Sequence, residues 1–86
     1  MTTINKLNQI SSLAISIQEM GLGSVNVWYC GHVDQISIDL YPGGWSKYLQ
    51  TRIHKNFYCD QPDAEINFLK LINYLQDCII NNEIKP

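Results

Sequence analysis

The segment VWYCGHVDQISIDLYPGGW, residues 27–45, gathers several side chains that could react or bind. Cys30, His32 and Asp34 supply, in close succession, a thiol nucleophile, a base and an acid. Catalysis needs the nucleophile and the base within hydrogen-bond reach, with a third group orienting the base. Residues of one turn seldom reach that geometry, so the pattern predicts no catalytic residue and we expect that the chain is not an enzyme.

The chain also offers four side chains of the types that bind zinc, namely Cys30, His32, His54 and Cys59. Their C-x-H and H-x₄-C spacings are not those of common zinc fingers or ribbons. The remaining cysteine, Cys78, makes the number odd, whereas a secreted disulfide scaffold has an even number. These observations predict no metal, no cofactor and a reducing, cytoplasmic location.

Aromatic side chains in the same segment are better candidates for binding than for catalysis. Trp28, Tyr41 and Trp45 each provide a large, rigid contact area of the kind that anchors protein interfaces. Alternatively, Trp28 is a cross-strand neighbour of Tyr41 that stabilises a sheet by ~0.5–1 kcal/mol. Both interpretations stay open on the sequence alone.

Basic residues concentrate in one place, which comprises Lys47, Arg52, His54 and Lys55. They form either the solvated side of a strand or loop, or a contact with phosphates or an acidic surface. The net charge of the whole chain is −2, whereas dedicated nucleic-acid binders are usually basic. Association with nucleic acid is therefore the alternative function that we keep.

A first helix is predicted from Thr3, its cap, to about Met20. Apolar residues recur in it at three- and four-residue spacing, which makes one stripe of Leu7, Ile10, Ala14 and Ile17. Gly21 can take the left-handed conformation after the last turn. Leu22 can then fold back on Ile17, as in a Schellman motif.

From residue 24 the pattern changes to the alternation of a β-hairpin. Gly31 and Asp34 provide the turn between its two runs, and Pro42 ends the second run. One face is apolar and buried, with Val25, Val27, Tyr29, Ile36, Ile38 and Leu40. The opposite, open face carries Asn26, Trp28, Cys30, Gln35, Ser37, Asp39 and Tyr41.

The segment Trp45–Cys59 is ambiguous. Its later part, around Ile53–Cys59, favours a third strand because of its β-branched and aromatic residues. The competing interpretation is a helix with a face formed by Tyr48, Leu49, Arg52 and Ile53.

A last helix is predicted to begin at Asp60 or Gln61, with Pro62 in its first turn. Its core stripe comprises Ala64, Phe68, Leu71, Ile72, Leu75, Cys78 and Ile79. A second flank, roughly 120–180° from the centre of that stripe, comprises Ile66, Leu69, Asn73 and Ile80. This flank either packs against the first helix or forms an interface, which makes Ile66, Leu69 and Ile80 candidate protein-binding residues.

Together these segments predict a single α+β domain over residues 1–86, in the order α-β-β-(β)-α. We expect a small antiparallel sheet with both helices packed on one face, and no membrane segment, because no run approaches ~18 apolar residues. The order of elements resembles that of the double-stranded-RNA-binding domain, in which lysines at the start of the second helix meet phosphates. Asp60, Asp63 and Glu65 lie at that position here, so the functional residues of that family do not carry over.

Two segments, GHVDQISIDLYPGGW and PDAEINFLKLINYL, resemble small orphan proteins encoded by phages, prophages and other mobile elements. This resemblance implies a protein that binds and occludes a host protein, as anti-CRISPR and anti-restriction inhibitors do. With the aromatic and apolar candidates, it predicts a small inhibitor or adaptor that acts stoichiometrically on a host or phage protein. A homodimer is an open alternative for the exposed surfaces.

Overall fold

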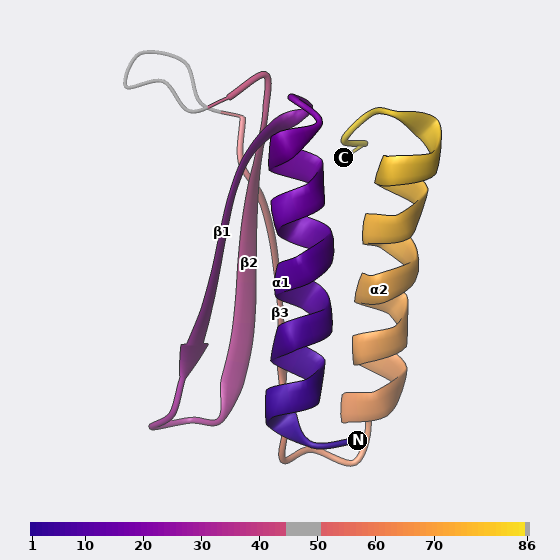
Figure 1. Cartoon of the computed structure of the whole chain (residues 1–86). Helices are drawn as coiled ribbons and strands as arrows, with labels where there is room; N and C mark the ends of the chain where they lie inside the picture. Colours follow the sequence, from indigo (N-terminus) through magenta and orange to yellow (C-terminus); the bar gives the residue numbers. More distant parts are fainter. Residues whose placement is uncertain (45–50, 86) are drawn as a thin grey trace.

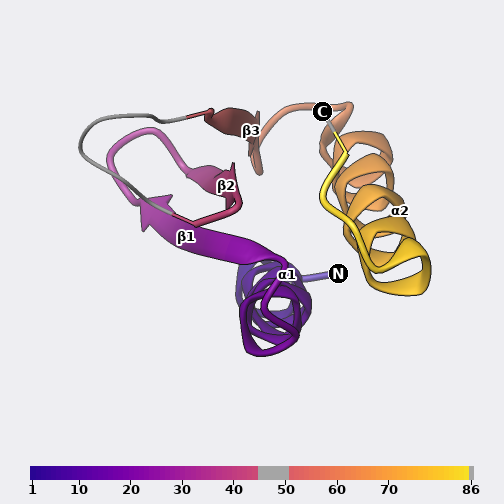
Figure 2. The ribbon, with the colours of Figure 1, turned by 90° about the horizontal axis from the view of Figure 1, so that it is seen from above.

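The computed structural model describes residues 1–44 and 51–85. It contains α1 (Thr3–Glu19), β1 (Gly23–Cys30), β2 (Gln35–Pro42), β3 (Ile53–Tyr58) and α2 (Ala64–Asn81). The strands form an antiparallel sheet in the order β1-β2-β3. Both helices lie on the same face of this sheet and run side by side in the same direction (Figures 1 and 2). The predicted α+β fold and its two-layer arrangement are therefore confirmed.

The ends of α1 follow from local chemistry. The hydroxyl of Thr2 accepts a hydrogen bond from the Asn5 amide at 3.1 Å, so the cap is Thr2 and not Thr3 as predicted. At the other end Gly21 has a φ of 77°, and the Leu22 amide donates to the Ile17 carbonyl at 3.3 Å. The predicted Schellman ending is therefore confirmed.

The third strand resolves part of the ambiguous segment. β3 pairs with β2 in a register that places Ile36 opposite Phe57 and Ile38 opposite Lys55. The helical interpretation is therefore wrong for residues 53–58, because an extended chain there completes the ladder along β2. Trp45 and Lys47 lie outside the described residues.

α2 begins later than predicted. Its cap is Asp63 and its first helical residue is Ala64, so Pro62 precedes the helix. The amide of Ala64 donates to the Gln61 carbonyl at 3.0 Å, within a turn that carries the chain from the sheet to the helical layer. The helix ends at Asn82, which adopts the left-handed conformation.

The core lies between the two layers. β2 contributes the fully buried Ile36, Ile38 and Leu40, as the alternation predicts. The apolar stripes of both helices cover them, and the core cluster includes Ile10, Ala14, Ile17, Phe57, Phe68, Leu71, Ile72, Leu75 and Cys78. This packing leaves the other face of the sheet without a helix (Figure 2).

One ion pair joins the first turns of the two helices. Lys6 is 4% exposed, and its ammonium lies 2.8 Å from the Glu65 carboxylate at the start of α2. The hydrogen bond from Lys6 lowers the pKa of Glu65 below its usual value. Because a buried ammonium without a partner is costly, the pair fixes how the helices meet.

Replacing Glu65 by Gln should lower the urea midpoint of unfolding at neutral pH, because Lys6 would keep its charge and lose its partner. The folded state depresses the pKa of Glu65, so the pair stabilises the fold above the ordinary glutamate pKa. That contribution disappears as the pH falls through the lowered pKa, and the two midpoints should then converge. The exposed Glu83→Gln is the control, and an equal loss in both variants would contradict this role.

Candidate protein-binding surface

The open face of the sheet brings together residues that are distant in the chain. The register places Asn26 of β1, Asp39 of β2 and His54 of β3 in one row across the sheet. The next row contains Trp28, Ser37 and Asn56. Successive side chains of a strand point to opposite faces of the sheet. Because Ile36, Ile38 and Leu40 face the helices, the two rows between them project from the opposite, open face.

Asp39 is the centre of this surface. Its side chain is buried, and its Oδ1 atom lies 2.7 Å from Nδ1 of His54. The guanidinium of Arg52 lies further away, with 3.8 Å between Nε and the same oxygen. The buried carboxylate is thus held between His54 of β3 and Arg52, which directly precedes this strand, as a charge removed from water requires.

His54 is held from both ring nitrogens. The side-chain amide of Asn56 donates to Nε2 of His54 at 2.8 Å, which leaves the proton on Nδ1 to be donated to Asp39. Hydrogen bonds at both nitrogens fix the orientation of the ring. His54 is therefore a rigid part of the sheet surface rather than a mobile basic side chain.

Trp28 packs beside this fixed imidazole. The centroids of the Trp28 and His54 rings lie 5.9 Å apart, with an angle of 36° between their planes. Trp28 nevertheless remains 41% exposed. The indole is therefore oriented by its neighbour while much of its area stays open to a partner. We call Trp28, Asp39, Arg52, His54 and Asn56 the indole surface.

Tyr41, a predicted candidate, and Ser37, on the same open face, are both buried. Tyr41 is only 8% exposed, so its ring offers little area to a partner. Both residues belong to β2, the central strand, where Ser37 lies between Trp28 and Asn56 and Tyr41 lies opposite Ser24 of β1. Trp45, the third aromatic candidate, lies outside the described residues.

The basic segment is divided between the two faces of the sheet. Arg52 and His54 project from the open face, where both approach Asp39. Lys55 projects from the opposite face, where its ammonium lies 4.4 Å from the centre of the Tyr74 ring of α2. These side chains therefore do not form one continuous cationic patch.

The second flank of α2 is not covered by α1. Ile66, Leu69 and Ile80 are 60%, 54% and 77% exposed, and Asn73 between them is exposed as well. Of the two interpretations of this flank, packing against the first helix is wrong. It forms an exposed apolar surface on the side of α2 away from the buried stripe of that helix.

Cys30, His32 and Asp34 of the hairpin turn do not form a hydrogen-bonded triad. Asp34 accepts a hydrogen bond from the Tyr29 hydroxyl, and this bond is the main cause of a rise in the pKa of Tyr29 to about 12. Asp34 therefore orients a phenol and not His32. Within residues 1–44 and 51–85, no group of three or more His, Cys, Asp or Glu side chains could hold a metal ion.

The sequence missed two parts of the indole surface, Asp39 and Asn56. The alternation places Asp39 on the open face and assigns it no role, and it does not single out Asn56. A register for the third strand would have revealed both, because Asp39 faces His54 directly. The position of the turn between β2 and β3, which decides that register, could not be read from the sequence.

Comparison with protein-family models, with curated proteins and with solved structures finds no match for this chain. Among the described residues, neither helix combines the length and the apolar character needed to cross a lipid bilayer. The function must therefore be argued from the surfaces themselves.

Proposed function

We propose that this chain is a protein-binding module, an inhibitor or adaptor that acts by occluding a surface of a partner protein. The observation that supports this most is the exposed Trp28, held against a His54 ring whose two nitrogens are both engaged. Tryptophan and arginine are the side chains most enriched at binding hot spots, and this surface holds one of each. Preorganisation of the indole reduces the entropy lost on binding.

The mode of action is stoichiometric. The indole surface contains no nucleophile beside His54, and both ring nitrogens of His54 are engaged within the chain. Such a surface serves recognition better than proton transfer. The partner class implied by the resemblance to mobile-element proteins, a host defence complex, remains part of the proposal.

Association with nucleic acid has less support. Arg52 already approaches the Asp39 carboxylate, and Lys55 lies on the other face of the sheet. Two carboxylates, Asp63 and Glu65, stand at the start of α2, where they would repel a phosphate backbone.

Affinity capture of the tagged chain from bacterial lysate, with and without nuclease, should test this proposal. We expect a protein that is recovered in near-stoichiometric amount by mass spectrometry and that survives nuclease treatment. Recovery that disappears with nuclease, and that weakens steeply with salt, would instead establish the nucleic-acid alternative. The Lys55→Ala variant separates the two outcomes further, because Lys55 lies on the face of the sheet opposite the indole surface. Nucleic-acid binding should then lose part of its salt dependence, whereas protein binding should not change.

A further inference from the structure

β1 is an edge strand whose own sequence lacks the residues that usually protect an edge against pairing. Among the described strands its only neighbour is β2, and its sequence GSVNVWYC contains no charged residue and no proline. Natural edge strands are commonly guarded by charged side chains, proline or bulges. β3, at the opposite edge, contains His54 and Lys55 and follows Arg52. The two edges of one sheet therefore differ, and β1 is the unguarded one.

The outward main-chain groups of β1 can be assigned. The Val25 amide donates to Oε1 of Gln18 on α1 at 3.2 Å, so this amide points away from β2. Successive amides of a strand point to alternate sides, and those of Val27 and Tyr29 therefore point away from β2 as well. These groups form the start of a ladder that a further strand could continue.

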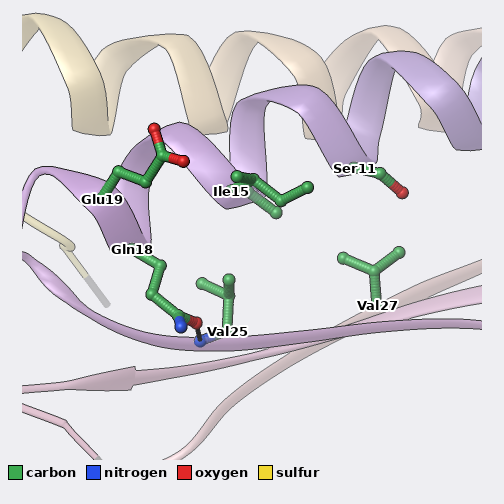
Figure 3. Close-up of a pocket in the computed structure, with 7 residues that line it drawn as sticks. Ser11, Ile15, Gln18, Glu19, Val25 and Val27 are labelled. Carbon is green, nitrogen blue, oxygen red and sulfur yellow. Dashed lines mark hydrogen bonds between the residues drawn. The ribbon is translucent and has the colours of Figure 1, made fainter.

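An apolar groove lies beside this edge, between α1 and β1 (Figure 3). Its volume is about 380 Å³, and Val25 and Val27 form its side on the sheet. Ile15 faces them from α1 and is 55% exposed. Ser11, Gln18 and Glu19 also line it, so the groove combines this apolar part with polar side chains of α1.

Tyr29, at the other end of β1, has a side chain that could fill such a groove. Tyr29 projects to the same face as Val25 and Val27, and it is 40% exposed. Its hydroxyl is already bonded to Asp34, and the raised pKa keeps the phenol uncharged at neutral pH. The ring is therefore available for apolar packing without leaving a polar atom unpaired.

We propose that β1 pairs antiparallel with β1 of a second copy of this chain, about a twofold axis at Val27. In that register Val25 lies opposite Tyr29 of the second copy, and each Tyr29 ring enters the groove beside Ile15 of the other copy. The outward amides of Val27 and Tyr29 then find carbonyl partners across the axis. In a twofold dimer the same surface of both copies forms the interface, so it must be complementary to itself. The groove and the Tyr29 ring lie at opposite ends of β1, so each groove can receive the ring of the other copy.

Electrostatics and side-chain pairing favour a second copy as the occupant. No like charges meet along the paired strands, because β1 has none. Valine opposite tyrosine is a stabilising cross-strand pair. The two open faces would also join into one sheet, so that two indole surfaces would face the same side. This dimer does not depend on the proposed partner protein and can be tested without it.

Sedimentation equilibrium of the purified chain from low micromolar to near-millimolar concentration should show a monomer–dimer equilibrium. Ile15→Lys should weaken dimerisation at least ~10-fold, because the Tyr29 ring of the second copy would meet a charge. Ile80→Lys on the second flank of α2 is the matched control and should leave it unchanged. Ile15 and Ile80 are both exposed, so far-UV circular dichroism should show both variants folded.

Amide hydrogen exchange identifies the edge directly. Exchange at Val27 and Tyr29 should slow as the protein concentration rises, while exchange at His54 and Asn56, on the opposite edge, should not change. A chain that stays monomeric throughout the range would overturn the proposal. A dimer that withstands Ile15→Lys, or that dissociates with Ile80→Lys, would overturn it equally, since the interface would then lie elsewhere.

Discussion

Replacement of Trp28 by alanine is expected to weaken binding of the captured partner by ~30-fold to 1,000-fold, the range of a strong hot-spot residue. The indole is 41% exposed and packs beside the His54 ring, so truncation removes a large and oriented aromatic contact area from this face. It also leaves the partner's matching groups without a neighbour. Isothermal titration calorimetry with the purified partner measures this change.

The matched control for this variant is Ile4→Ala. Ile4 is 69% exposed on α1, the layer opposite the indole surface, and its truncation should leave affinity unchanged. Far-UV circular dichroism should show both variants folded, because neither side chain belongs to the core. Affinity that is equal for Trp28→Ala and the wild type would exclude the indole surface as the site. Leu69→Glu would then test the second flank of α2.

Gly23→Ala should destabilise the fold by ~3 kcal/mol or more, through overpacking at the start of β1. A β-carbon at position 23 would lie 2.8 Å from Cδ1 of Ile84 and would overlap the main-chain oxygen of Tyr41. The oxygen belongs to the main chain of β2, where Tyr41 pairs with Ser24 of β1, so it cannot move without disturbing this pairing. Thermal unfolding should show a fall of roughly 4–8 °C for each kcal/mol lost.

Gly31→Ala separates this effect from the general cost of replacing a glycine. A β-carbon at position 31 meets only Cε2 of Tyr29 at 3.5 Å, which is an ordinary contact. Gly31 also has no positive φ, so alanine is tolerated by the main chain. Its midpoint should stay close to that of the wild type. If both variants lose the same stability, steric overlap at position 23 is not the cause.

The sequence by itself determined the elements and the core. Apolar spacing in α1 and α2, and alternation in β1 and β2, each indicated one buried face, and the structure packs those faces into or against the core. The prediction is wrong for Tyr29, which lies near the end of β1, where the helices do not cover it, and is 40% exposed. These predictions succeeded because periodicity depends on local geometry alone. The Schellman ending at Gly21 succeeded for the same reason, since its hydrogen bonds join residues close in the chain.

Tertiary structure alone decided which polar residues meet. Lys6 and Glu65 are far apart in the chain, and the parallel packing of the two helices brings them into an ion pair. The sequence groups His54 with the basic residues of its segment, whereas the register of β3 places its ring beside Asp39 and Trp28. Arg52 and Lys55 share that segment but project from opposite faces, because successive residues of a strand alternate. Contacts of this kind depend on how distant segments pair, and the spacing of residues within one segment does not predict that pairing.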